Sequence, residues 1–164
     1  MNAGLCRKLI AVMLVTALGA CDDASQVKPS SEIVLTTEAL KDMPTVQISL
    51  QDVVDTYVLG SNRTDLQREV MSAKLVGSIV SWRFKVYDIA KEDGRYRVIS
   101  ELMDGSLAGA FGKFGVVAFI APRDEIDIDV LLKLQTGHEV EIRGRVDGVS
   151  ARTALVLSPA ELVR

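Results

Sequence analysis

The sequence predicts a mainly β fold, in which a short helix is followed by five strands that close into a small barrel. Two observations predict it. From residue 76 onward apolar side chains recur at every second position, and turn signals containing glycine or proline separate the alternating segments. A length of 164 residues suits one such domain. Apolar residues make up 48% and charged residues 25%, which excludes a chain that is disordered throughout.

The first twenty residues have the pattern of a secretory signal peptide. Arg7 and Lys8 form a basic start, and the apolar run Leu9–Leu18 that follows is too short to span a bilayer. The next residues, Leu18-Gly19-Ala20-Cys21, resemble the cleavage site of bacterial lipoproteins, which implies cleavage before Cys21 and lipidation of its thiol. The alternative is an ordinary signal peptide followed by a chance cysteine. We expect a chain that is anchored to a membrane through Cys21.

Cleavage at this point leaves residues 21–164, with no thiol free for a disulfide, a metal site or a nucleophile. It removes two basic side chains and no acidic one, so the net charge falls from −3 to −5. Residues 21–45 are predicted to form a flexible tether, and residues 46–164 the folded domain. Asp22 and Asp23 resemble the signal that retains lipoproteins in the inner membrane of enteric-type bacteria. This implies the periplasmic face of that membrane rather than the outer membrane; the alternative is that they only begin the tether.

Capping residues predict the helices. Ser49 followed by Asp52 predicts the start of a helix over residues 50–59, which Gly60 ends. Thr64 followed by Gln67 predicts another helix start, from which residues 70–75 lead toward the core. Residues 37–41 are compatible with a helical turn. A further short helix is predicted between residues 124 and 137.

Alternation and turn residues predict the strands. In the first of them Val80, Trp82, Phe84 and Val86 are predicted to face the core. The continuous apolar run Val116–Ile120 predicts a strand buried on both faces. Hairpin turns are expected at residues 92–94 and at 147–148, a loop over 104–115, and an end to the last strand at Pro159. The five predicted strands are 80–87, 95–100, 116–120, 139–146 and 154–157.

Five strands with a helix between the third and the fourth fit an OB-fold barrel, with another small β-barrel or an open α+β sheet as alternatives. Three further segments carry a resemblance to a known family: Thr64-Asp65-Leu66-Gln67-Arg68-Glu69, Leu75-Val76-Gly77-Ser78-Ile79-Val80-Ser81-Trp82, and Gly137 to Val146. They resemble the tRNA-anticodon-like OB-fold proteins of bacterial envelopes, over roughly residues 46–160. The resemblance implies the fold and says little about activity, because that family is largely uncharacterised.

No catalytic, metal or cofactor motif is found in the sequence. His138 is the one histidine and is expected on the surface. The acidic run Asp124–Asp129 does not match an EF-hand loop and is interpreted as helix caps and a solvated face. The glycines of 104–115 are not followed by the Gly-Lys-Ser/Thr of a phosphate-binding loop. We therefore expect no enzyme and no cofactor.

Basic side chains give the strongest candidate site. They are expected on the outer positions of neighbouring strands, where together they would form one positive face. The alternative is cross-strand pairing with interleaved glutamates on a solvated sheet. The predicted ligand-binding residues are Arg83, Lys85, Arg97, Arg143 and Arg145, with Arg95 on the same face.

The resulting hypothesis is a membrane-anchored, periplasm-facing and non-enzymatic binding module, whose partner is an envelope protein or an anionic envelope ligand. The alternative is an OB-fold lipoprotein that binds single-stranded nucleic acid or a nucleotide, for example in DNA uptake or conjugation. Nucleic acid is disfavoured because the chain is acidic and few aromatic side chains are available for stacking.

Overall fold

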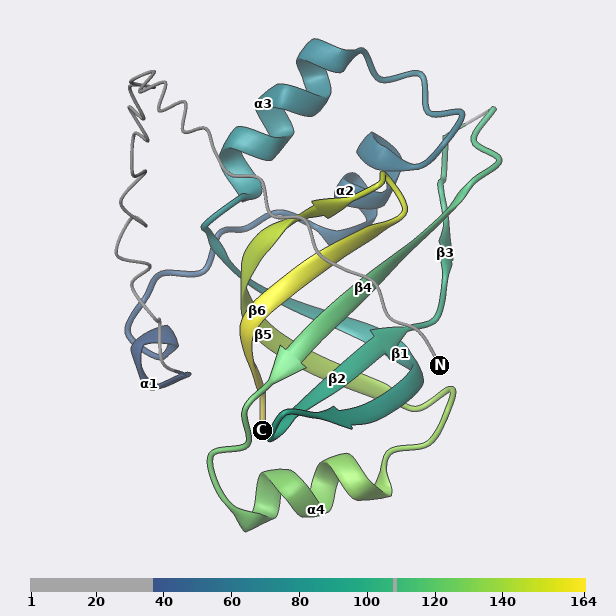
Figure 1. Ribbon diagram of the computed structural model, residues 1–164. Helices are drawn as coiled ribbons and strands as arrows, with labels where there is room; N and C mark the ends of the chain where they lie inside the picture. The colour runs from purple at the N-terminus through teal and green to yellow at the C-terminus, as the bar shows by residue number, and fades with distance from the viewer. Residues whose placement is uncertain (1–36, 108) are drawn as a thin grey trace, which may run out of the picture. The chain divides into compact units, whose positions relative to one another are not determined.

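Five strands of the computed structural model close into a barrel, and the structure describes residues 37–107 and 109–164 (Figure 1). Pairing runs from β1 to β2, β4, β6, β5 and back to β1, and only β4 and β6 are parallel. A helix, α4, connects β4 to β5. This order is that of an OB-fold, as predicted. The strands are β1 (Ile79–Glu92), β2 (Arg95–Ser100), β4 (Lys113–Ile120), β5 (Glu139–Ser150) and β6 (Ala154–Leu162), with a short β3 (Met103–Asp104) beside β4.

Within the described residues, four helices accompany the barrel: α1 (Thr37–Leu40), α2 (Leu50–Tyr57), α3 (Asp65–Leu75) and α4 (Glu125–Lys133). In Figure 1, α4 lies at one end of the barrel, and α2 and α3 lie toward the other. The predicted caps are present: Ser49 accepts from the backbone N–H of Asp52, and Thr64 with Gln67 forms a capping box.

Helix α3 is only lightly packed. Leu75 is its one buried residue among those described, whereas Val70 is 49% exposed although residues 70–75 were expected to lead into the core. The predicted signal peptide, Cys21, Asp22 and Asp23 lie outside the described residues. Within the segment predicted as a tether, Leu40 of α1 is fully buried and Thr45 forms a bridge to Ile79 of β1, so residues from 37 onward take part in the folded unit.

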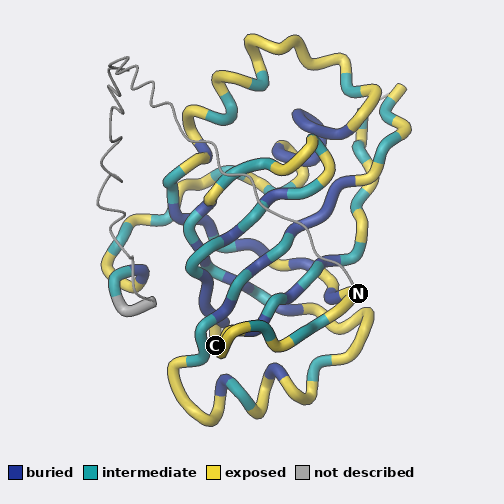
Figure 2. The backbone as a smooth tube through the Cα atoms, viewed as in Figure 1, coloured by how far each residue is buried: buried dark blue, intermediate teal, exposed yellow. Residues whose placement is uncertain are grey.

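The core combines the inward-facing side chains of the barrel with apolar residues of α2, Leu75 of α3 and Leu131 of α4. In Figure 2, buried residues alternate with more exposed ones along the strands. The prediction for β1 is confirmed, because Val80, Trp82, Phe84 and Val86 are all buried. Trp82 is 5% exposed, and its indole N–H donates to the carbonyl of Ile48 at 2.8 Å. That bond satisfies its one polar group in the interior.

Strand β4 is buried on its inner face only, which corrects the prediction of a strand covered on both sides. Val116 and Ala118 point into the core, while Val117 and Phe119 are half-buried on the outer face. Strand β4 lies between β2 and β6, and these neighbours shield part of each outer side chain. Apolar residues are therefore tolerated on the outer face of β4 as well as on its inner face. No second layer covers that face among the described residues.

The final hairpin also differs from the prediction. Strand β5 continues through Asp147 and Gly148 to Ser150, and the turn lies at residues 151–153 instead. Strand β6 continues through Pro159 to Leu162. Both strands are irregular here: the pairing shifts register next to Asp147 and again next to Pro159, and such bulges accommodate residues that cannot join a regular ladder.

Candidate ligand-binding surface

The predicted basic face is divided by the bend of β1. The pairing shifts register between Val86 and Asp88, so the first half of β1 pairs with β5 and the second half with β2. Arg97 lies opposite Ala90, seven residues farther along β1 than Arg83, or about 23 Å of strand. The cations of β2 therefore lie in a different region from those of β1 and β5.

On the β1–β5 side the basic residues face glutamates. Arg83 forms an ion pair with Glu141 at 2.9 Å, and Lys85 lies opposite Glu139. Hydrogen bonds from Arg83 and Ser81 lower the pKa of Glu141 below its usual range. This arrangement is the cross-strand pairing that was considered as the alternative to a ligand face.

Arg143 is largely covered, although the sequence predicts it on the exposed basic face. Its side chain is 16% exposed, donates to the carbonyl of Met43 at 2.6 Å and pairs with Glu161 at 3.4 Å. The segment that connects α1 to α2 supplies this cover, which strand alternation alone does not reveal. Arg145, opposite Ile79, is half-buried.

A network of ion pairs extends from Arg143 to the C-terminus. Glu161 also pairs with Arg123, whose guanidinium binds Asp127 at 2.9 Å, and Arg164 binds the same carboxylate. Burial would raise the pKa of Asp127, but hydrogen bonds from Arg123 and Arg164 outweigh it and hold that pKa well below its usual range. Asp127 is only 1% exposed, so this part of the predicted solvated acidic run is a structural anchor joining α4 to the chain end.

The outer face of β2 and β4 carries a different combination of side chains. The guanidinium of Arg95 lies 5.5 Å from the ring centre of Phe119, and Arg97 is paired across the strands with Phe119 and forms an ion pair with Glu92 at 2.8 Å. Beside them Ile99, Val117 and Val156 follow one another across β2, β4 and β6. The sequence analysis missed Phe119 as an outer aromatic; strict alternation counted from Val116 would have indicated it.

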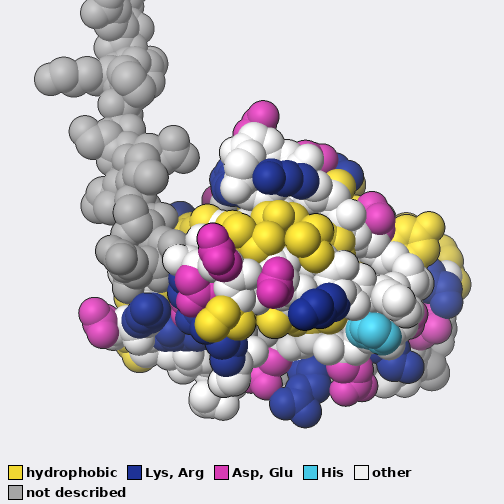
Figure 3. All heavy atoms as spheres, turned by 90° about the horizontal axis from the view of Figure 1, so that it is seen from below, with side chains coloured by type: hydrophobic (Ala, Val, Ile, Leu, Met, Phe, Trp, Pro, Cys, Tyr) yellow, Lys and Arg dark blue, Asp and Glu magenta, His cyan; other side chains and the backbone are white. Residues whose placement is uncertain are grey.

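The face of the molecule seen in Figure 3 does not gather charge of one sign. On the face shown in Figure 3, basic and acidic side chains are interspersed around a band of hydrophobic ones, and His138 lies at one side. His138 is exposed, and its Nδ1 accepts from the backbone N–H of Gln135 at 3.2 Å. Within residues 37–107 and 109–164 no cluster of three or more metal-binding side chains is found, and no helix has the length and apolar character needed to cross a membrane.

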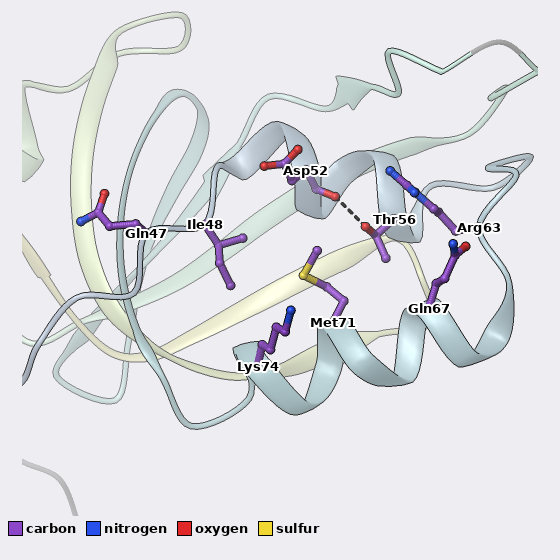
Figure 4. A pocket seen from close by; sticks show the side chains of 8 residues that line it. All are labelled: Gln47, Ile48, Asp52, Thr56, Arg63, Gln67, Met71 and Lys74. Atoms are coloured by element: carbon purple, nitrogen blue, oxygen red, sulfur yellow. Dashed lines mark hydrogen bonds between the residues drawn. The ribbon is translucent and has the colours of Figure 1, made fainter.

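A cleft lies between α2 and α3 (Figure 4). Its volume is about 280 Å³, and it combines an apolar floor with two basic side chains and one acidic side chain. The lining residues are Gln47, Ile48, Asp52, Thr56, Arg63, Gln67, Met71 and Lys74.

No protein-family model matches the chain, and no curated protein matches it in sequence. Among solved structures, it is similar to a Klebsiella pneumoniae protein described provisionally as a nucleic acid-binding lipoprotein, with 20% identity, a TM-score of 0.44, and coverage of 79% of this chain and 99% of that one. It is also similar to an OBody bound to hen egg-white lysozyme (16%, TM-score 0.33, 56% and 86%) and to the S. pombe Stn1–Ten1 complex (13%, 0.29, 52% and 58%). The OB-fold assignment rests on the strand order of this chain itself.

Proposed function

We propose that this protein is a lipid-anchored, non-enzymatic binding module held by Cys21 at the periplasmic face of the inner membrane. The sequence Leu18–Cys21 behind a short apolar run supports the anchor, and Asp22 and Asp23 support the inner membrane. An anchor of two or more acyl chains gives stable attachment. The closed barrel supports a binding role, because OB-folds present one outer face and the adjoining loops to a ligand.

The contact surface in this proposal is the outer face of β2 and β4. The observation that carries it is the Arg95–Phe119 stack with Arg97 beside it, because a cation over an aromatic ring offers both charge and a flat apolar surface. The ligand is an anionic segment of an envelope protein or an anionic envelope polymer. Of the residues predicted from the sequence, Arg97 lies in this surface. Arg83 and Lys85 are candidates for peripheral contacts only, because each faces a glutamate.

Single-stranded nucleic acid is the second candidate, and the same Arg95–Phe119 pair favours it, because aromatic rings and arginine planes stack on bases. The net charge of −5 for residues 21–164 and the pairing of Arg97 with Glu92 act against it. We therefore propose an anionic protein or polymer segment, rather than nucleic acid, as the ligand.

Two measurements test the proposal. Mass spectrometry of the mature N-terminus is expected to show a lipid-modified Cys21; an unmodified Cys21 or cleavage elsewhere contradicts the anchor. The folded domain is then titrated with an Asp/Glu-rich peptide and with oligo-dT at graded salt. Arg95→Glu and Phe119→Ala are expected to weaken peptide binding and Arg83→Ala to leave it nearly unchanged. Preferential binding of oligo-dT favours the second candidate instead.

A further inference from the structure

The cleft of Figure 4 is lined by residues other than those of the β2–β4 face. We propose that it binds the free carboxyl terminus of an extended peptide. The carboxylate is attracted by Arg63 and Lys74, which flank the cleft from opposite ends of α3, and the preceding residues run along the edge of β1.

The charge of the cleft favours a carboxylate. Within the part of the chain that the structure describes, neither Arg63 nor Lys74 has an ion-pair partner within 4 Å. Asp52 is the one acidic residue of the lining, and its carboxylate already accepts from the hydroxyl of Ser49 at 2.6 Å. With two cations and one carboxylate, the lining of the cleft has a net positive charge. Hydrogen bonds from such cations to a carboxylate are stronger than those between neutral groups.

The neutral groups fit the rest of a peptide end. Gln67 accepts the backbone N–H of Thr64 with its Oε1 at 2.9 Å in the capping box, so its amide nitrogen is the group left to donate into the cleft. Ile48 and Met71 form the apolar part of the lining, where the last side chain of a peptide would pack. Methionine adapts readily to side chains of different shape.

The cleft adjoins a larger hollow that gives the peptide room to continue. This second cavity, of about 600 Å³, shares Gln47, Ile48 and Asp52 with the first. It extends to Ser81 and Trp82 of β1 and to Glu141 of β5. A ligand whose end lies in the small cleft can therefore extend toward β1.

At this place β1 has an open edge. On the side away from β5, the carbonyl of Ile79 accepts from Val46 at 2.8 Å and that of Lys85 accepts from Glu101 at 2.7 Å. Between these two bonds, the backbone groups of Ser81 and Arg83 on that side have no hydrogen-bond partner among the described residues. An extended peptide adds to such an edge through main-chain hydrogen bonds.

The chain supplies its own reporter for a binding test. Trp82 is the single tryptophan, and it lines the second cavity. Its indole N–H donates to the carbonyl of Ile48, a residue that lines both cavities. The probes are N-acetyl-Ala-Ala-Leu with a free carboxylate, the same tripeptide as its C-terminal amide, and sodium acetate. Binding is followed by Trp82 fluorescence and by backbone amide NMR shifts of residues 45–49 and 81–83.

The free-acid tripeptide is expected to bind at least about tenfold more tightly than the amide and than acetate, because each lacks one part of the recognised group. Arg63→Gln and Lys74→Gln are each expected to weaken it about tenfold. Lys133→Gln, an exposed lysine on α4 at the other end of the barrel, is the matched control and is expected to change nothing.

Four results would overturn the proposal. Three are equal binding of acid and amide, acetate binding as tightly as the tripeptide, and unchanged binding in both cleft variants. The fourth is the absence of any spectral change up to millimolar tripeptide. Circular dichroism melts of Arg63→Gln and Lys74→Gln verify that a loss of binding is not a loss of fold. None of these results depends on the β2–β4 face, so they are independent of the proposed function.

Discussion

Asp55 of α2 and Ser106 are joined by two hydrogen bonds, in which the backbone N–H of Ser106 donates at 2.6 Å and its hydroxyl donates to the same carboxylate. Asp55 is only 7% exposed. Burial would raise its pKa, but the bonds from Ser106 and Gln51 outweigh that effect and lower the pKa below its usual range. This contact, with the bonds that Phe111 and Gly112 donate to the carbonyl of Leu59, holds the glycine-rich segment against α2.

Replacing Asp55 is expected to loosen this segment. In Asp55→Ala the N–H and the hydroxyl of Ser106 lose their acceptor, which should lower the free energy of unfolding by about 1–3 kcal/mol. Amide hydrogen exchange at residues 105–107 should become faster. Asp129→Asn, an exposed aspartate on α4, is the control. Unchanged exchange in Asp55→Ala would contradict the role assigned to this contact.

Trp82 is expected to be one of the most sensitive core positions. Trp82→Ala removes a buried aromatic side chain and should cost about 3–5 kcal/mol in a urea unfolding experiment. Trp82→Phe retains most of the packing but leaves the carbonyl of Ile48 without its donor, so a smaller loss is expected. Equal losses in the two variants would show that the hydrogen bond, and not packing, dominates.

Arg83 and Arg143 are expected to respond very differently to the same substitution. Arg83 is 68% exposed, so Arg83→Ala removes a surface ion pair worth about 0–1 kcal/mol. Arg143→Ala leaves the nearly buried Glu161 with one cation fewer and the carbonyl of Met43 without its donor, so a loss of about 2–4 kcal/mol is expected. Thermal melts of the two variants decide this; similar melting temperatures would contradict the burial of Arg143.

Asp127 should make stability depend on pH in acid. Its pKa in the folded protein lies below the ordinary 3.8, so its stabilising contribution is fully present above about pH 5 and declines as pH falls through 3.8 and lower. Urea unfolding between pH 7 and pH 2 should show this decline. In Asp127→Asn the protein should be less stable at pH 7, and the decline toward low pH should be shallower. A decline as steep as in the wild type would assign the acid sensitivity to other carboxylates.

Two glycines of β5, Gly144 and Gly148, differ in the space that an added methyl group would find. A Cβ at Gly144 would lie 2.9 Å from the Cβ of Ala160, closer than real Cβ contacts come, and a tight 3.1 Å from the carbonyl oxygen of Pro159. Gly144→Ala should therefore destabilise the β5–β6 pairing by about 1–3 kcal/mol. At Gly148 nothing lies within 4 Å of the added atom, so Gly148→Ala should be nearly neutral. Chemical denaturation compares the two directly.

Much of the barrel could be predicted from sequence because the relevant forces are local. The alternation of Val80, Trp82 and Phe84 determines which face of β1 is buried, whatever strand lies beside it. The caps at Ser49 and Thr64 act on backbone groups three residues away. The hairpin at Asp93 and Gly94 follows from two left-handed residues in succession.

The candidate sites were decided by the tertiary structure. The register shift after Val86 separates Arg97 from Arg83, and no local pattern announces such a bulge. Met43 and Arg143 meet across 100 residues of chain, and Asp55 and Ser106 across 51. Whether a charged side chain is paired, buried or free depends on which distant segment lies against it. The sequence by itself therefore determined the strands, the caps and the predicted lipid attachment at Cys21. The barrel's closure determined which arginines are structural and where the clefts lie, because those depend on contacts between segments that are remote in the chain.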